Sequence, residues 1–431
     1  MSVRVLFLVV TPLLLLAAGL GFLAAEARAR PAAPTLYWPD DVVLEMRSLV
    51  ERSYVDEVPP EQAKGLFYAA CKAYLSGLDP YCEFLTPEER RAMEQETQGE
   101  FGGVGIVGKP TGDGILVRGT RQGDPAWDAG IRAGDLLLSI DGADTRVEGA
   151  RDVLHRLRGE PGTAVAVSWR HRDGGGPREA TVVRSRIKQD SVVGVAMADA
   201  GAGVGYLRIA RFQENTAADL KAALARLKAD GARSFVVDLR SDYGGVLPAA
   251  VACADCFLDE GVVVVTRSRA GLERPTHLAG RDPGDVLDAP LVLLVDGNTA
   301  SAAEVLAGAL QDYRRAVLVG ERTFGKFLVQ RIVPLEGKDV AVRLTTARYF
   351  TPYGRTLQRD DARGVRGGLV PDVPATATEA QRRAIAEAVF EEQQGLDWVL
   401  LPGSPAPEDP ILARAVGLLR DADAARAADG K

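Results

Sequence analysis

Ser301 and Lys326 are the residues whose types and setting could do chemistry together. Ser301 follows an apolar run, residues 291–295, and the turn sequence Asp-Gly-Asn-Thr-Ala. Lys326 lies 25 residues further along, in the apolar context Thr-Phe-Gly-Lys-Phe. A serine hydroxyl needs a base before it attacks an amide, and lysine becomes that base when burial lowers its pKa. The pair therefore predicts acyl transfer with a serine nucleophile and a lysine base.

Two further residues fit this chemistry. Ser301 begins a helical pattern, so the N–H of Ala302 points toward an anion at the helix start and predicts an oxyanion donor. Gln330 follows Lys326 by four residues and is expected to hold or orient it. Taken singly, a serine at a helix start is usually a cap, a lysine is usually solvated, and Gln330 could be an ordinary polar strand residue. Their joint occurrence favours the catalytic interpretation.

A histidine-based triad is the competing mechanism. The chain has three histidines, His155, His171 and His277. None lies in a sequence motif typical of a serine–histidine–aspartate hydrolase. The sequence therefore favours the lysine base over a histidine base.

Residues 236–245, Val-Val-Asp-Leu-Arg-Ser-Asp-Tyr-Gly-Gly, form another apolar run that ends in paired glycines before a helical pattern. Together with residues 291–330, this segment resembles the carboxyl-terminal processing peptidases, or tail-specific proteases, which are serine peptidases with a Ser–Lys dyad. The resemblance implies that Ser301 is the nucleophile and Lys326 the base. It also implies that Gly245, whose backbone can approach a ligand closely, is the second oxyanion donor beside Ala302.

The sequence departs from the family pattern at a few positions, which are Asp242-Tyr243 in place of Asn-Pro, Thr299 and Ala303 in place of serines, and Phe327 in place of glycine. All of the proposed catalytic residues remain. Phe327 is expected to crowd the cleft, which would change substrate preference rather than chemistry. Asp312 falls in the family's Gln-Asp position, and a structural role is expected for it.

Other segments extend the resemblance to roughly residues 40–420. Residues 78–89, Leu-Asp-Pro-Tyr-Cys-Glu-Phe-Leu-Thr-Pro-Glu-Glu, resemble the family's helical region, with Thr86 as a helix cap and Pro87 in the first turn. Residues 123–142 resemble a PDZ domain. The loop before them resembles its carboxylate-binding loop, whose backbone N–H groups capture a peptide C-terminus; its residues are Gly102, Gly103, Val104, Gly105 and Ile106.

The elements that position these residues alternate between strands and helices after residue 190. Apolar runs predict strands at 204–209, 235–239, 262–266, 291–295 and 317–319, and helical patterns occupy 216–230, 246–258 and 301–313. This order predicts an α/β fold with mainly parallel pairing, and the resemblance implies a crotonase-like (Clp-protease-like) peptidase core with an inserted PDZ domain. The expected segments are 1–30 (signal peptide or membrane anchor), 31–98 (N-terminal helical region), 99–187 (PDZ domain), 188–375 (peptidase core) and 376–431 (C-terminal helices).

Composition and charge bear on the possible partners, cofactors and location of the protein. A net charge of −7 over 431 residues offers no basic surface for nucleic acid. The spacing of the four cysteines is not that of a metal site, and neither a metal nor another cofactor is expected. The positions of Cys253 and Cys256 in a helical pattern favour packing in the core. Whether any cysteines form disulfides is left open. Arg4 and an uncharged apolar stretch, residues 5–25, predict export to a periplasmic or other extracytoplasmic location. That stretch is also long enough to be a membrane anchor, so cleaved signal and retained anchor both stay open.

These observations predict an exported serine endopeptidase that cleaves polypeptides near their free C-termini. The alternative is a non-catalytic PDZ scaffold with a degenerate peptidase core. An acyl-CoA enzyme is a second alternative, because that chemistry uses the same fold class. The sequence leaves open the substrate, whether the PDZ domain activates or inhibits, and whether the protein forms homo-oligomers or binds an adaptor.

Overall fold

The computed structural model describes residues 40–146, 150–269, 273–277, 286, 288–392, 398–400 and 408–428. The chain divides into two compact units, Met1–Ala69 and Ala70–Lys431. The expected export segment, residues 1–30, lies outside the described residues. Within the described ranges, no helix combines the length and the apolar character needed to cross a membrane.

The region predicted as helical contains helices and one short strand: α2 (Asp40–Ser53), α3 (Pro60–Ser76), β1 (Glu83–Leu85) and α4 (Pro87–Gln98). Helix α4 begins as predicted, because Thr86 Oγ1 accepts a hydrogen bond from Glu89 N (3.3 Å) and Glu89 Oε2 accepts one from Thr86 N (2.9 Å). The strand β1 was not predicted. It pairs with β18 (Ala341–Phe350), so its partner lies far along the chain.

The predicted PDZ region contains two antiparallel sheets, one of them two-stranded, and two short helices. Its elements are β2 (Glu100–Gly103), β3 (Ile106–Thr111), β4 (Gly114–Arg121), α5 (Pro125–Asp128), β5 (Leu136–Ile140), β6 (Ala143–Asp144), α6 (Ala150–His155), β7 (Ala164–Arg170), β8 (Arg178–Val183) and β9 (Ser185–Lys188). Apolar residues from β4, β5 and β7 form its core, and Val153 and Leu157 contribute to that core from α6 and the turn after it. A late strand, β20 (Trp398–Leu400), also pairs with β4.

The peptidase region is built on a six-stranded sheet in the order β10-β11-β12-β15-β16-β19. Its strands are β10 (Val192–Asp199), β11 (Val204–Ile209), β12 (Ser234–Asp238), β15 (Leu291–Val295), β16 (Val317–Gly320) and β19 (Val373–Pro374). Every neighbouring pair is parallel except β10 and β11. The predicted α/β order with mainly parallel pairing is therefore confirmed.

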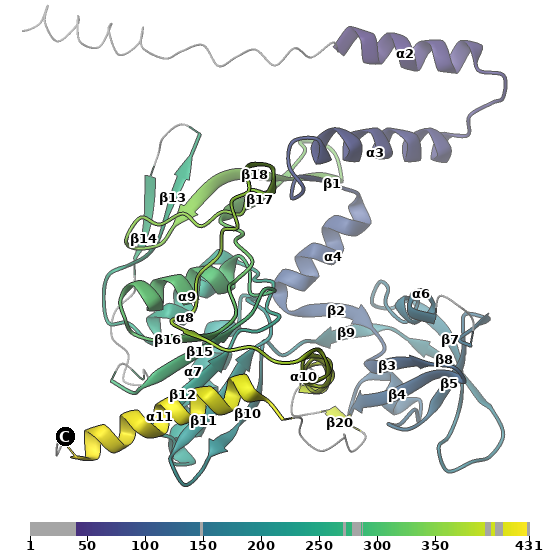
Figure 1. Ribbon diagram of the computed structural model, residues 1–431. Coiled ribbons are helices and arrows are strands. Elements are labelled where there is room, and N and C mark those ends of the chain that lie inside the picture. Colours follow the sequence, from purple (N-terminus) through teal and green to yellow (C-terminus); the bar gives the residue numbers. More distant parts are fainter. Residues whose placement is uncertain are drawn as a thin grey trace, which may run out of the picture. The chain divides into compact units, whose positions relative to one another are not determined.

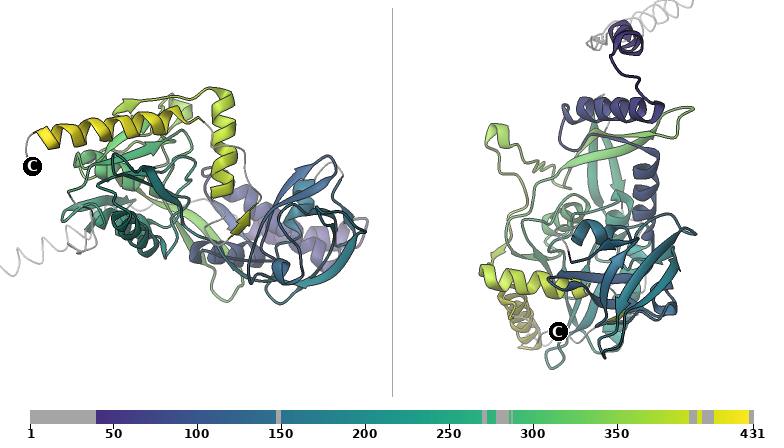
Figure 2. Two further views of the ribbon diagram at one scale, coloured as in Figure 1. Left: turned by 90° about the horizontal axis from the view of Figure 1, so that it is seen from below. Right: turned by 90° about the vertical axis from the view of Figure 1, so that its right-hand side faces the viewer.

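Helices cover both faces of this sheet because alternate residues of its buried strands point to opposite sides. Phe235 and Val237 of β12 pack in one core with α7 (Thr216–Ala229), α8 (Leu247–Asp255) and α9 (Ala302–Asp312). Val236 packs in a second core with α11 (Pro410–Ala428), which crosses the sheet on the other face (Figures 1 and 2). The predicted C-terminal helices are α10 (Glu379–Glu392) and α11.

A second sheet is antiparallel and contains β1, β13 (Val262–Ser268), β14 (Glu273–His277), β17 (Leu328–Pro334) and β18. The predicted strand at 262–266 exists, but it belongs to this sheet and not to the parallel one. Its partners are β14 and β18, which run antiparallel to it. Lys326 lies two residues before β17, so this sheet positions the predicted base.

The four cysteines are free thiols. Cys253 and Cys256 are fully buried at α8 and its end, inside the core shared by α7, α8 and α9. The packing interpretation of this Cys-x-x-Cys sequence is therefore confirmed.

Candidate active site

Ser301 lies at a sharp turn between β15 and α9. Its φ of 58° is in the left-handed region that non-glycine residues seldom occupy. The preceding turn is held by the Asp296 carboxylate, whose Oδ1 accepts hydrogen bonds from Asn298 N (3.0 Å) and Thr299 N (2.9 Å). Such strain is stored where surrounding contacts fix the backbone, and it often accompanies function. Here the strained backbone belongs to Ser301 itself, which directly precedes the buried helix α9.

Glu304, in the first turn of α9, joins the serine and lysine segments. Its Oε2 accepts hydrogen bonds from Ser301 N (3.0 Å) and Lys326 N (2.8 Å), and its Oε1 accepts from Thr323 Oγ1 (2.6 Å) and Gly325 N (2.7 Å). Burial raises the pKa of this carboxyl, while the four donors oppose the shift. The sequence analysis missed Glu304, although Ser-x-x-Glu at a helix start is the signal of a capping box.

Lys326 lies in a largely buried setting. Its Nζ stands 4.6 Å from the centre of the Tyr81 ring. Burial lowers the pKa of this lysine, and Arg343 lowers it further, whereas Asp79 and Glu304 act in the opposite direction. The direction is the one that a neutral lysine base requires.

Tyr349 lies between the two predicted catalytic residues. Its hydroxyl donates a hydrogen bond to the carbonyl oxygen of Lys326 and interacts with the Ser301 side chain. Burial raises the pKa of this phenol well above its ordinary value, so Tyr349 is neutral. Among the hydrogen bonds of the described residues, none joins the Ser301 hydroxyl directly to the Lys326 ammonium. In this conformation the segments that carry Ser301 and Lys326 are therefore connected through Glu304 and Tyr349.

The glycine pair lies against the serine turn. A side chain at Gly244 would meet Ala302 N at 2.8 Å, so only glycine allows this approach. Gly244 N donates to Asp242 Oδ1 (2.8 Å) and is therefore occupied. In the described part of the chain, neither Gly245 N nor Ala302 N donates to a protein acceptor. These two N–H groups are the ones that the sequence analysis assigned to an oxyanion hole.

Asp242 holds the glycine pair and the serine turn together. Its backbone oxygen accepts a hydrogen bond from Ala300 N (2.9 Å), and its side chain is fully buried. Its Oδ2 has no hydrogen-bond partner among the described residues. Burial raises the pKa of this carboxyl well above its ordinary value, against the effect of Arg211 and Arg208. Asp242 therefore ties the glycine pair to the backbone of Ala300, just before Ser301.

Three other predicted residues lie at the edge of this site or away from it. The Gln330 amide donates to Thr345 Oγ1 (3.4 Å), and no described contact joins it to Lys326. Asp312 accepts a hydrogen bond from Tyr353 N (2.9 Å) at the far end of α9, as a structural role would require. The expectation that Phe327 crowds the cleft is wrong. Its side chain is fully buried in the core, with its ring 4.9 Å from that of Tyr349.

The predicted carboxylate-binding loop lies between strands of the PDZ region. Gly102 and Gly103 end β2, Val104 and Gly105 follow, and Ile106 begins β3. Val104 is buried, and its carbonyl oxygen accepts a hydrogen bond from Ala126 N (2.9 Å). Gly105 has a φ of 75°, and a side chain there would meet the Asp124 carboxylate at 2.4 Å.

Comparison with known proteins adds sequence relatives to this geometry. The pattern of peptidase family S41 matches residues 203–375, and that of a PDZ domain matches residues 117–170. A carboxy-terminal-processing protease of Bartonella bacilliformis is 35% identical over 329 residues, which are 75% of this chain and 72% of that protein. A carboxyl-terminal-processing protease of Picosynechococcus is 37% identical over 351 residues, which are 77% of this chain and 82% of that protein.

Solved structures also resemble the chain. A photosystem II D1 C-terminal processing protease shares 32% sequence identity with it, with a TM-score of 0.44. The similarity covers 77% of this chain and 91% of that one.

Proposed function

The chain belongs to peptidase family S41, and we therefore propose that it is a serine peptidase that cleaves polypeptides near their C-termini with Ser301 and Lys326 as its dyad. The observation that carries the proposal is the carboxylate of Glu304, which binds the backbone of both residues at once. The two unoccupied N–H groups beside Ser301 support it, because they supply an oxyanion hole.

In the proposed reaction, Ser301 Oγ attacks the carbonyl carbon of the scissile amide while neutral Lys326 Nζ takes the hydroxyl proton. Gly245 N and Ala302 N donate hydrogen bonds to the oxyanion that forms. The C–N bond then breaks, and the lysine gives its proton to the leaving amine. Water hydrolyses the acyl-enzyme by the same proton transfers in reverse order. Because no hydrogen bond joins Ser301 Oγ to Lys326 Nζ among the described residues, the two groups must come closer before attack.

The activity should rise with pH as Lys326 loses its proton. Because burial and Arg343 disfavour the charged ammonium, this rise in activity should lie below the ordinary lysine pKa of about 10.4. Replacing Arg343 with glutamine removes one of these effects, so the rise in activity should move to higher pH. The measurement is kcat/KM against pH for the wild-type protein and Arg343→Gln, with Lys338→Arg as an exposed control. A profile that stays flat, with chemistry rate-limiting, would contradict a lysine base.

We propose further that residues 99–187 recognise free C-terminal carboxylates through the loop that ends in Gly105 and Ile106. An extended peptide can add to an open strand edge while backbone N–H groups receive its terminal carboxylate. Residues 1–30 are proposed to direct export, either as a cleaved signal or as an anchor.

Amidation of the substrate's C-terminus should therefore raise KM, because it removes the charge that the loop receives. The measurement is kcat/KM for matched peptides with free and amidated ends. Gly105→Ala should reduce the preference for the free end, since the substituted residue is strained and meets Asp124. Gly112→Ala is the control, because that glycine faces open space. Equal kcat/KM for both peptides in all three proteins would show that this chain does not read C-termini.

A further inference from the structure

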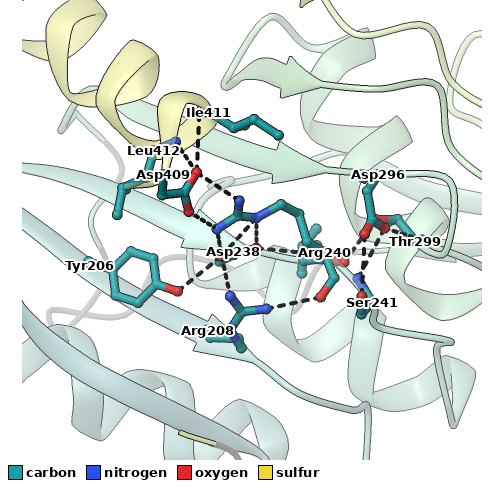
Figure 3. Close-up of polar contacts among 11 residues, drawn as sticks. Tyr206, Arg208, Asp238, Arg240, Ser241, Asp296, Thr299, Asp409, Ile411 and Leu412 are labelled. Atoms are coloured by element: carbon teal, nitrogen blue, oxygen red, sulfur yellow. Dashed lines mark hydrogen bonds and ion pairs between the residues drawn. The ribbon is translucent and has the colours of Figure 1, made fainter. Parts of the chain in front are cut away.

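A buried cluster of charges lies beside Ser241 (Figure 3), in the loop that continues to the glycine pair Gly244 and Gly245. Arg208 comes from β11, Asp238 ends β12, Arg240 follows it, and Asp409 precedes α11. Asp238 is fully buried, and the side chains of Arg208 and Arg240 are 2% and 5% exposed. We call these four residues the Arg240 cluster. Its two arginines and two aspartates balance in charge.

The guanidinium of Arg240 is held between two carboxylates. On one side, its Nε lies 3.0 Å from both oxygens of Asp238, and its Nη2 lies 2.6 Å from Asp238 Oδ2. On the other side, Nη1 and Nη2 donate to Asp409 Oδ1 (3.1 Å) and Oδ2 (2.7 Å). Paired hydrogen bonds of this kind fix the plane of the guanidinium as well as its position. Arg240 therefore has a single orientation set partly by α11.

Asp409 also caps its own helix. Its Oδ1 accepts hydrogen bonds from Ile411 N (3.1 Å) and Leu412 N (3.0 Å). One carboxylate thus satisfies the first turn of α11 and the arginine that follows β12. It ties the C-terminal helix to a residue 169 positions earlier in the chain.

The backbone continues from Arg240 directly into the proposed oxyanion loop. The carbonyl oxygen of Arg240 accepts a hydrogen bond from Arg208 Nη1 (3.1 Å). The next residue, Ser241, has a φ of 58°, and its N–H donates to Asp296 Oδ1 (3.0 Å) at the serine turn. Asp242 and the glycine pair follow. A displacement of Arg240 would therefore pass within five residues to Gly245 N.

We propose that Asp409 is a positioning residue for the oxyanion hole, acting through Arg240, so that the C-terminal helix sets the geometry of the catalytic loop. This inference rests on the proposed peptidase function. It gives the segment 408–428 an indirect role in catalysis, through Arg240.

Removing the Asp409 charge should leave a buried guanidinium with half of its neutralising partners. Of its two carboxylate partners, Arg240 would keep only Asp238, which it shares with Arg208, and a poorly compensated buried positive charge favours rearrangement. Asp409→Asn is the informative change, because asparagine caps a helix as well as aspartate does. We expect kcat per folded molecule to fall by about 10-fold to 100-fold, since small misplacements near reacting groups cost that much. KM should change little, because substrate binding lies elsewhere.

Two controls separate this effect from a loss of stability. Asp423→Asn neutralises another α11 carboxylate, which pairs with the exposed Arg233 (2.8 Å) and not with a buried arginine. Leu419→Ala loosens the buried face of the same helix without changing a charge. Circular dichroism measures the thermal unfolding and the folded fraction of all three variants, so that kcat can be expressed per folded molecule for each.

The deciding readout is affinity for a peptide boronic acid, which forms a tetrahedral adduct with the serine hydroxyl. Because the adduct uses the oxyanion hole, Asp409→Asn should weaken its binding by about the same factor as kcat, while both controls bind as the wild-type protein does. If Asp409→Asn matched the controls in kcat per folded molecule and in boronate affinity, the inference would be overturned. Ser301→Ala tests the proposed function separately: cleavage by that variant would overturn the function, whatever Asp409→Asn does.

Discussion

Replacing Ser301 with alanine should lower kcat for peptide cleavage by about 10⁴-fold or more, because the chain loses its nucleophile. Lys326→Ala should have an effect of similar size, since a serine without its base is a poor nucleophile at neutral pH. The double variant should be little worse than either single one, because both residues act in one step. The measurement is single-turnover cleavage of a peptide with a free C-terminus.

The fold should survive these changes. The backbone N–H groups of Ser301 and Lys326 donate hydrogen bonds to Glu304, and these bonds remain when the two side chains are shortened. Circular dichroism and thermal unfolding should therefore be close to those of the wild-type protein. Lys338→Ala serves as the control for removal of an exposed lysine. Near-normal turnover in either alanine variant would show that the dyad is assigned wrongly.

Replacing Glu304 should damage both stability and catalysis. Its two oxygens receive four hydrogen bonds, two of them from the backbone of Ser301 and Lys326. In Glu304→Gln, an amide NH₂ would face two of those donors, and in Glu304→Ala all four donors would be left unsatisfied. Each buried donor without a partner costs about 1–3 kcal/mol, so the free energy of unfolding should fall by several such increments in the alanine variant. We expect kcat to fall by about 100-fold in Glu304→Gln, because the nucleophile and the base lose their common anchor.

Glu89→Gln provides a matched control for this prediction. Glu89 closes the same type of capping box, with Thr86 at the start of α4, but it does not contact the serine or lysine segments. Its replacement should cost stability of the order of 1 kcal/mol and leave kcat unchanged. Chemical denaturation measures the first quantity and single-turnover cleavage the second. If Glu304→Gln kept wild-type kcat, its proposed role in joining the dyad would be wrong.

Local sequence signals could predict the elements that carry the site. The turn before Ser301, the glycine pair and the helix patterns are encoded within a few residues each, and the structure has them where the sequence placed them. The Thr86 cap and the parallel order of the core strands follow from equally local patterns. Glu304 was within reach of the same reasoning, because its capping motif, Ser-x-x-Glu, spans only four residues.

Contacts between distant segments could not be predicted in this way. Tyr81 reaches Lys326 because β1 pairs with β18, and neither strand's sequence specifies its partner. Tyr349 meets the carbonyl of Lys326 because β17 and β18 form a hairpin with an irregular register. Arg240 and Asp409 are brought together by the packing of α11 on the sheet. Phe327 was placed wrongly for the same reason, since only the sheet's packing decides which side of the strand is core.

The most direct test of the dyad is covalent labelling with a fluorophosphonate probe, followed by mass spectrometry of the labelled peptide. The probe phosphonylates an activated serine and expels fluoride, so it reports activation independently of substrate preference. We predict one modified residue, Ser301, no labelling in Ser301→Ala, and strongly reduced labelling in Lys326→Ala. Labelling of a different serine, or undiminished labelling of Ser301 without Lys326, would contradict a Ser301–Lys326 peptidase.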